Sequence, residues 1–221
     1  MKDILLLHNI KCGGSTLNEI VKNSNKTYTR TKLYNQFLFK DYKVIISSIR
    51  NPYNYYISAI FYNRKSRGRV SPESEPYLRK IEKLPKEEYF KLYVKGILTG
   101  KIILKNESVG ITNNNVDSMM KKHNIGLFTA RTLALFFNNR GKYLKKLSLN
   151  NNITKIIKLE NIEEDLKKLN LTYNNIAENT SRLGKVNIND YYDQELIDLI
   201  YEKDKFIFKK FNYDKINLVD N

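Results

Sequence analysis

The chain is poor in the residues that build several common classes of protein. Among its 221 residues there are one cysteine, no tryptophan, four prolines and nine glycines. A single cysteine excludes an internal disulfide and any metal site made of several cysteines. No apolar run approaches the roughly 20 residues that a membrane-spanning helix needs, and Ile4–Leu7 is too short for the apolar region of a signal peptide. We therefore expect no membrane span and a cytoplasmic location.

Acidic residues are also scarce, with 23 against 39 lysines and arginines, which gives a formal net charge of +16. Such a positive field attracts anions, whether a nucleotide, an acidic acceptor molecule or nucleic acid. The abundance of lysine, asparagine, isoleucine and tyrosine can equally reflect an AT-rich genome. The sequence contains no helix-turn-helix, zinc-finger or ribonucleoprotein signature, so we do not expect nucleic acid as the partner.

The most informative segment is Leu6–Thr16, where a short apolar run stops at Lys11, Gly13-Gly14 and Ser15-Thr16. A helical pattern, Leu17–Val21, follows at once. This order predicts a strand, a tight turn and a helix N-terminus, where backbone N–H groups and the helix dipole bind an anion. We interpret it as an anion-binding loop for a nucleotide phosphate. The alternative is an ordinary turn with Ser15 or Thr16 as N-cap, and Lys11 precedes the glycines, unlike the lysine of the usual nucleotide loop.

A second segment has the same character. Val44–Ile49 is β-branched and apolar and predicts a buried strand, which ends at Arg50. Pro52 suits the first turn of a helix, and Ser58 lies about two helical turns after Arg50. Arg50 and Ser58 are therefore candidates for a second oxyanion site, although an ordinary surface arginine before a helix would look the same.

Strands and helices alternate along the chain. We expect strands at 4–10, 44–49 and 153–159, and helices at 15–24, 53–64, 89–98, 116–122, 129–137, 161–169 and 194–208. Residues 25–43 are expected to include a short strand or helix that lines the acceptor cleft. This alternation predicts an α/β fold with a central parallel β-sheet flanked by helices on both faces. Ligands of such sheets bind beyond the carboxyl ends of the strands, where both segments lie.

The length suits one domain, residues 1–221. Within it, residues 64–69 are basic and interrupted by glycine, and Pro72, Pro76 and Pro85 follow. We interpret residues 64–90 as a mobile lid or insertion, with a simple surface loop as the alternative.

Together the two segments resemble the sulfotransferases that use 3′-phosphoadenosine 5′-phosphosulfate (PAPS). The first motif of that family often reads His-Ile-Pro-Lys-Thr-Gly-Gly-Thr-Ser, against His8-Asn9-Ile10-Lys11-Cys12-Gly13-Gly14-Ser15-Thr16 here. The second often reads Arg-(Asn/Asp)-Pro-Tyr followed by Ser-Ala, against Arg50-Asn51-Pro52-Tyr53 and Ser58-Ala59. Looser similarities are Ile125-Gly126-Leu127, Asn179-Thr180-Ser181 and Asp190-Tyr191-Tyr192 with Glu195-Leu196. Ile10 and Cys12 depart from the family's proline and threonine.

This resemblance implies a P-loop-NTPase-like fold with a helical insertion. It also implies PAPS as donor, adenosine 3′,5′-bisphosphate (PAP) as product, no metal, and a hydroxyl acceptor, foremost a carbohydrate. The implied nucleotide-binding residues are Lys11, Cys12, Gly13, Gly14, Ser15 and Thr16 at the 5′-phosphosulfate, Arg50 and Ser58 at the 3′-phosphate, and Arg182 and Lys185 closing over the nucleotide. A cation aimed at developing charge is usually a large catalytic term, so Lys11 is our candidate for stabilising the leaving oxygen.

The general base is less well indicated. His8 matches the motif histidine and can titrate near neutral pH, and we take it as the catalytic candidate. His123 and Glu160 are further candidates, with a solvated helix end and a loop-holding carboxylate as their structural alternatives; Glu19 and Asp41 also stay open. Two other functions remain alternatives: a small-molecule kinase with an atypical phosphate loop, and a non-catalytic module that binds nucleic acid or acidic glycans.

Overall fold

The computed structural model describes residues 2–9, 11–31, 41–63, 70–104, 116–136, 154–173 and 187–218. The chain divides into two compact units, each assembled from several segments. The first, which we call the sheet unit, comprises Met1–Asn51, Val109–Thr112 and Thr132–Arg182; the second, the helical unit, comprises Pro52–Ser108, Asn113–Arg131 and Leu183–Asn221.

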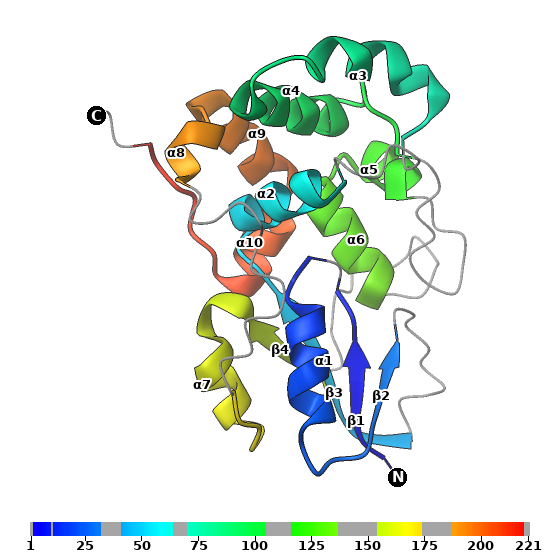
Figure 1. The fold of residues 1–221 in the computed structure, drawn as a ribbon, viewed down its shortest axis with the longest axis vertical. Coiled ribbons are helices and arrows are strands. Elements are labelled where there is room, and N and C mark those ends of the chain that lie inside the picture. The colour runs from blue at the N-terminus through cyan, green and yellow to red at the C-terminus, as the bar shows by residue number, and fades with distance from the viewer. Residues whose placement is uncertain are drawn as a thin grey trace. The chain divides into compact units, whose positions relative to one another are not determined.

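The sheet unit contains four parallel strands in the order β2-β1-β3-β4 (Figure 1). Their bounds are Lys2–Leu7 for β1, Tyr28–Thr31 for β2, Tyr42–Ile49 for β3 and Thr154–Lys158 for β4. The prediction of an α/β fold with a parallel sheet is therefore confirmed. The continuous apolar runs of β1 and β3 fit central strands, which are buried on both faces. The short edge strand β2 lies in the segment 25–43, for which we expected a short strand or helix.

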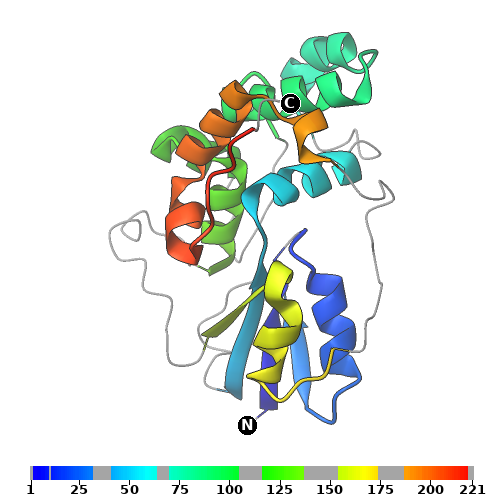
Figure 2. The ribbon, with the colours of Figure 1, turned by 90° about the vertical axis from the view of Figure 1, so that its left-hand side faces the viewer.

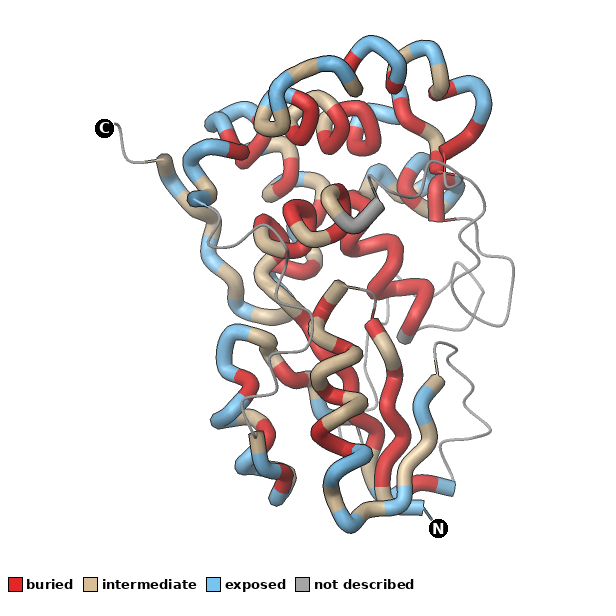
Figure 3. The backbone as a smooth tube through the Cα atoms, viewed as in Figure 1, coloured by how far each residue is buried: buried red, intermediate tan, exposed pale blue. Residues whose placement is uncertain are grey.

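One face of this sheet is covered by α1 (Gly14–Lys22) and α7 (Ile162–Lys167), which Figure 2 shows on the same side of the strands. Apolar side chains from both helices and from alternate strand positions form the core there: Ile4, Leu6, Leu17, Ile20, Val21, Ile46, Ile157, Ile162, Leu166 and Leu171. The opposite face carries Leu5, Leu7 and Ile45, which are also fully buried, and β1 and β3 are largely red in Figure 3. Burial on both faces anchors the strand ends that carry the two motifs.

The helical unit contains most of the helices and is organised around aromatic side chains. Its elements are α2 (Pro52–Asn63), η3 (Pro72–Ser74), α3 (Glu75–Ile81), α4 (Lys86–Leu98), α5 (Val116–His123), the start of α6 (Leu127–Phe136), α8 (Ile188–Tyr191), α9 (Gln194–Lys203) and α10 (Lys205–Phe211). The rings that pack together include Tyr53, Tyr55, Tyr56, Phe90, Phe128, Tyr191, Tyr192 and Phe208. No helix within the described residues has the length and apolarity needed to cross a bilayer.

Part of the segment expected to be a lid or insertion is helical. Residues 72–81 form η3 and α3, and α4 begins at Lys86, whereas residues 64–69 lie outside the described part of the chain. Pro72 and Pro76 each occupy one of the first two positions of a helical turn, where a proline costs no hydrogen bond. These prolines start short helices.

The expectation of one helix over 194–208 is wrong, because the chain breaks it at Asp204 into α9 and α10. The Asp204 carboxylate is fully buried and accepts hydrogen bonds from the Thr129 backbone N–H (2.7 Å) and the Tyr56 hydroxyl (2.6 Å). Thr129 is the third residue of α6, so Asp204 caps that helix from a distant part of the chain. The tertiary contact overrides the apolar periodicity of the sequence.

This buried carboxylate predicts a pH-dependent stability. Burial raises the pKa of Asp204 from 3.8 to about 6, although the hydrogen bonds from Tyr56 and Thr129 oppose the rise. Between these values the folded protein keeps a proton that the unfolded chain has lost, so stability falls as pH increases. We expect wild type to lose roughly 3 kcal/mol relative to Asp204→Asn between about pH 4 and pH 7. Urea unfolding at several pH values measures this difference, and parallel curves for the two proteins would contradict it.

Candidate functional site

The two sequence motifs lie at neighbouring strand ends in the sheet unit. The chain leaves β1 toward β2 on one side of it, whereas β3 lies on the other side and is followed in the sheet by β4. The carboxyl ends of β1 and β3 therefore flank a topological switch point, where open α/β sheets form their ligand crevice. Leu7 pairs with Ser47 in the register, and the buried Asn9 side chain donates to the Ser48 carbonyl (3.1 Å). This bond ties the first motif to the second.

The loop after β1 has the expected order of strand, turn and helix. The turn is held by the Cys12 N–H, which donates to the Asn9 carbonyl (3.4 Å), and α1 begins at Gly14. Gly13 is the N-cap residue, and no side chain caps the helix there. Ser15 and Thr16 thus lie inside the first turn, and neither is the N-cap, so the ordinary N-cap explanation does not fit the structure. A first turn with a glycine cap is typical of anion-binding helix ends.

Both glycines of the loop are required by its geometry. Gly13 has a φ of 74°, and a Cβ there would also lie 2.5 Å from Leu159 Cδ1. Gly14 has no unusual φ, but a Cβ at this position would lie 2.2 Å from His8 Nδ1. The His8 ring therefore packs directly against the first residue of α1.

Lys11 stands out by its backbone conformation. Among the described residues, four non-glycine positions have positive φ: Lys11 (64°), Asn124, Asn170 and Asn212. The three asparagines follow helices, where this residue tolerates the left-handed region. Lys11 is the exception, and a left-handed conformation costs a residue with a Cβ about 1–2 kcal/mol. Strain of this kind persists where surrounding structure imposes it and is often found at functional sites.

Cys12 is completely buried, so its side chain packs into the protein and does not line an open crevice. This favours a packing role over a reactive thiol, because reactive cysteines are at least partly exposed. A ligand in the loop could meet only the backbone of this residue.

Arg50 follows β3 directly and is half-buried. The next residue, Asn51, donates its backbone N–H to the Glu160 carboxylate (2.7 Å), which lies in the short helix η5 (Leu159–Asn161) directly after β4. This bond shows the loop-holding role that was the structural alternative for Glu160. It fixes the peptide between Arg50 and Pro52, the point where the chain passes into the helical unit.

The remaining predicted site residues do not lie at the ends of β1 and β3 within the described part of the sheet unit. Ser58 lies on α2, half-buried and in the helical unit, whereas Lys11 and Arg50 belong to the sheet unit. Arg182 and Lys185, and Ile10 of the first motif, lie outside the described residues. His123 is the last residue of α5, and Glu19 pairs with Lys22 on α1 (3.6 Å). None of these observations places His123 or Glu19 at the switch point.

Several residues of the family-like motifs have structural roles. Tyr53 and Tyr192 are buried and in edge-to-face contact, and the Tyr192 hydroxyl donates to the Tyr53 carbonyl (2.7 Å). Gly126 leaves room for Asp204, because a Cβ would lie 2.4 Å from its carboxylate. These matches reflect packing in the helical unit.

Two residues near the carboxyl ends of the strands were not predicted from the sequence. Arg30, on β2, donates to His8 Nδ1 (3.0 Å). Ser48 is 1% exposed, and its hydroxyl has no hydrogen-bond partner among the described residues. It is paired with Ile157 in the register, which places it on the α1 face at the level of the loop. Leaving a buried hydroxyl without a hydrogen-bond partner costs free energy. In the sequence, a serine near the end of an otherwise apolar strand could have indicated this position.

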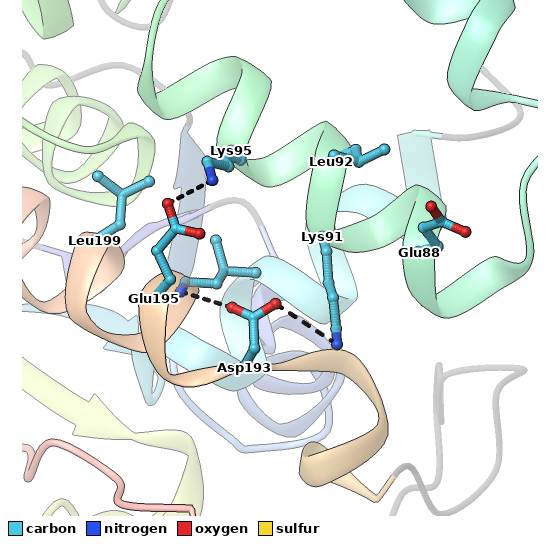
Figure 4. Close-up of a pocket in the computed structure, with 8 residues that line it drawn as sticks. Glu88, Lys91, Leu92, Lys95, Asp193, Glu195 and Leu199 are labelled. Atoms are coloured by element: carbon cyan, nitrogen blue, oxygen red, sulfur yellow. Dashed lines mark hydrogen bonds and ion pairs between the residues drawn. The ribbon is translucent and has the colours of Figure 1, made fainter.

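A hollow lies in the helical unit between α4 and α9 (Figure 4). Four of its charged side chains point toward one another across the two helices: Lys95 pairs with Glu195, and Lys91 approaches Asp193 (3.7 Å). Asp193 also caps α9 through the Leu196 N–H (2.9 Å). Since these charges are paired with each other, we interpret them as ion pairs that hold α4 and the start of α9 together, and we do not interpret the hollow as a ligand site.

Comparison of the chain with protein-family models, with curated proteins and with solved structures gave no significant match.

Proposed function

We propose that the protein is a sulfotransferase that moves a sulfuryl group from PAPS to a hydroxyl acceptor, foremost a carbohydrate. The observation that carries this proposal is the meeting of the glycine loop and Arg50 at the ends of two adjacent parallel strands, joined by the bond from Asn9 to Ser48. Two cationic segments at one crevice suit a ligand with phosphates at both ends. The motif resemblance supplies the identity of that ligand.

In this proposal each part of the loop has a separate task. The first-turn amides of α1 and the positive end of its dipole bind the 5′-phosphosulfate, and Gly13 and Gly14 let the backbone approach it. Lys11 stabilises the charge that develops on the oxygen bridging phosphorus and sulfur as the bond to sulfur breaks. Arg50 binds the 3′-phosphate, and the motif resemblance also assigns Ser58, Arg182 and Lys185 to the nucleotide.

The test is a comparison of nucleotides that differ in the 3′-phosphate. PAP should raise the melting temperature far more than AMP or ADP, since a ligand at a hundred times its Kd stabilises by about 2.7 kcal/mol. Arg50→Ala should abolish that preference, whereas Arg79→Ala, at an exposed arginine paired with Glu75 on α3, should leave it intact. Equal shifts for all three nucleotides, or none, would refute the proposal.

Binding measurements with other ligands distinguish the two alternative functions. Magnesium-dependent stabilisation by ATP would indicate the small-molecule kinase. Tight and steeply salt-dependent binding of nucleic acid or acidic glycans, without binding of PAP, would indicate a non-catalytic module.

A further inference from the structure

Arg30 and His8 form a contact that neither motif predicts. Leu6 pairs with Arg30 in the parallel register, and His8 follows Leu6 by two positions, so both side chains lie on the α1 face of the sheet. The His8 N–H donates to the Thr31 carbonyl (2.8 Å), which fixes the backbone of His8 against β2. Arg30 Nη2 then lies 3.0 Å from His8 Nδ1.

The chemistry of this pair determines where the imidazole carries its proton. A guanidinium group has donors only and stays charged, so Nδ1 must be the acceptor. In the neutral ring the proton is therefore on Nε2. A doubly protonated ring would point its Nδ1–H at a cation, and like charges at this distance disfavour that form. The contact thus selects a neutral His8.

The position of the ring makes this tautomer relevant to the loop. Nδ1 and Cε1 lie 2.2 and 2.6 Å from the point where a Cβ of Gly14 would be. The imidazole is thereby held against the first residue of α1, beside the helix N-terminus. Arg30 and Gly14 both meet the Nδ1 edge of the ring, which limits how far the imidazole can turn.

We propose that Arg30 is a positioning residue: it holds His8 as the Nε2–H tautomer, and His8 serves the anion bound at the loop as a neutral hydrogen-bond donor. This inference rests on the proposed function for the identity of that anion, the 5′-phosphate end of the nucleotide. It also replaces our expectation that His8 is the general base, since its proton-accepting nitrogen is engaged by Arg30.

The first test needs no ligand. The chain has two histidines, so nitrogen-15 labelling of histidine gives two rings, and His123→Gln identifies the signals of His8. At neutral pH we expect Nδ1 of His8 to show the chemical shift of an acceptor and Nε2 that of a protonated nitrogen. Arg30→Met should shift His8 toward a mixture of tautomers, whereas Arg30→Lys, which keeps a charged donor, should preserve the wild-type pattern. An Nδ1–H ring in wild type, or a pattern unaffected by Arg30→Met, would overturn the inference.

The second test uses PAP as the probe. His8→Gln keeps an amide donor and removes any base, so its affinity for PAP should stay within about threefold of wild type, whereas His8→Ala should lose about tenfold or more. Equal losses in both variants would contradict the donor role. Failure of wild type to bind PAP would refute the proposed function instead, and the tautomer measurement on the free protein would still decide the role of Arg30.

Discussion

Replacing Lys11 with methionine is expected to lower the rate of sulfuryl transfer by about a hundredfold to a thousandfold. Methionine has a similar length and the same left-handed strain at this position, so the change removes the charge and little else. Transfer of radiolabelled sulfuryl from PAPS to a panel of oligosaccharides measures the effect. Release of free sulfate to water is a readout that needs no identified acceptor.

The product nucleotide separates catalysis from binding. Because PAP lacks the sulfuryl group, its affinity should fall much less than the transfer rate if Lys11 acts mainly on the transition state. Lys11→Arg should retain part of the activity. Unchanged transfer by Lys11→Met would remove Lys11 from the mechanism even if PAP binds.

Lys11→Gly adds an independent check on the strain. Glycine adopts the observed φ of 64° without a steric penalty, but its unfolded chain has more freedom to lose. The net expectation is a gain in unfolding free energy of up to about 1 kcal/mol, together with the loss of activity. A variant that is more stable and less active would indicate that the strain is maintained for function.

The sheet and the first site were predictable because their signals are local. The apolar run before Lys11 and the β-branched run before Arg50 specify two buried strands, and the glycines mark the turn at which α1 starts. A parallel sheet then brings the two strand ends to one edge. The register that makes β1 and β3 direct neighbours is a tertiary fact, and no local pattern specifies it.

The parts that sequence reasoning missed depend on contacts between distant residues. Asp204 interrupts a helical pattern because its carboxylate binds two distant residues. Thr129, where it caps α6, is 75 positions away along the chain, and Tyr56 is 148 positions away. Arg30 gains its role only when β2 pairs with β1 and places it beside His8. Nothing in the local sequence around Asp204 or Arg30 indicates these distant partners.

Gly126→Ala is expected to destabilise the protein by about 1.5–5 kcal/mol. Its Cβ would lie 2.4 Å from the Asp204 carboxylate, which has no room to move because it is fully buried. Displacing the carboxylate removes the cap of α6, at a cost of about 0.5–2 kcal/mol, and leaves the buried Tyr56 hydroxyl without its acceptor, at about 1–3 kcal/mol. Urea unfolding followed by circular dichroism measures the loss.

Gly100→Ala is the matched control, since it is the same substitution but its expected destabilisation has a different cause. Gly100 has a φ of 78° and nothing within 4 Å of the added Cβ, whereas Gly126 has no positive φ and a severe contact. Backbone strain alone predicts a loss of about 1–2 kcal/mol for Gly100→Ala. In the Asp204→Ala background, Gly126→Ala should cost little more, because the contact, the cap of α6 and the acceptor of Tyr56 are already gone. If Gly126→Ala costs no more than Gly100→Ala, the carboxylate is not confined as the structure requires, and Asp204 cannot be the fixed cap of α6.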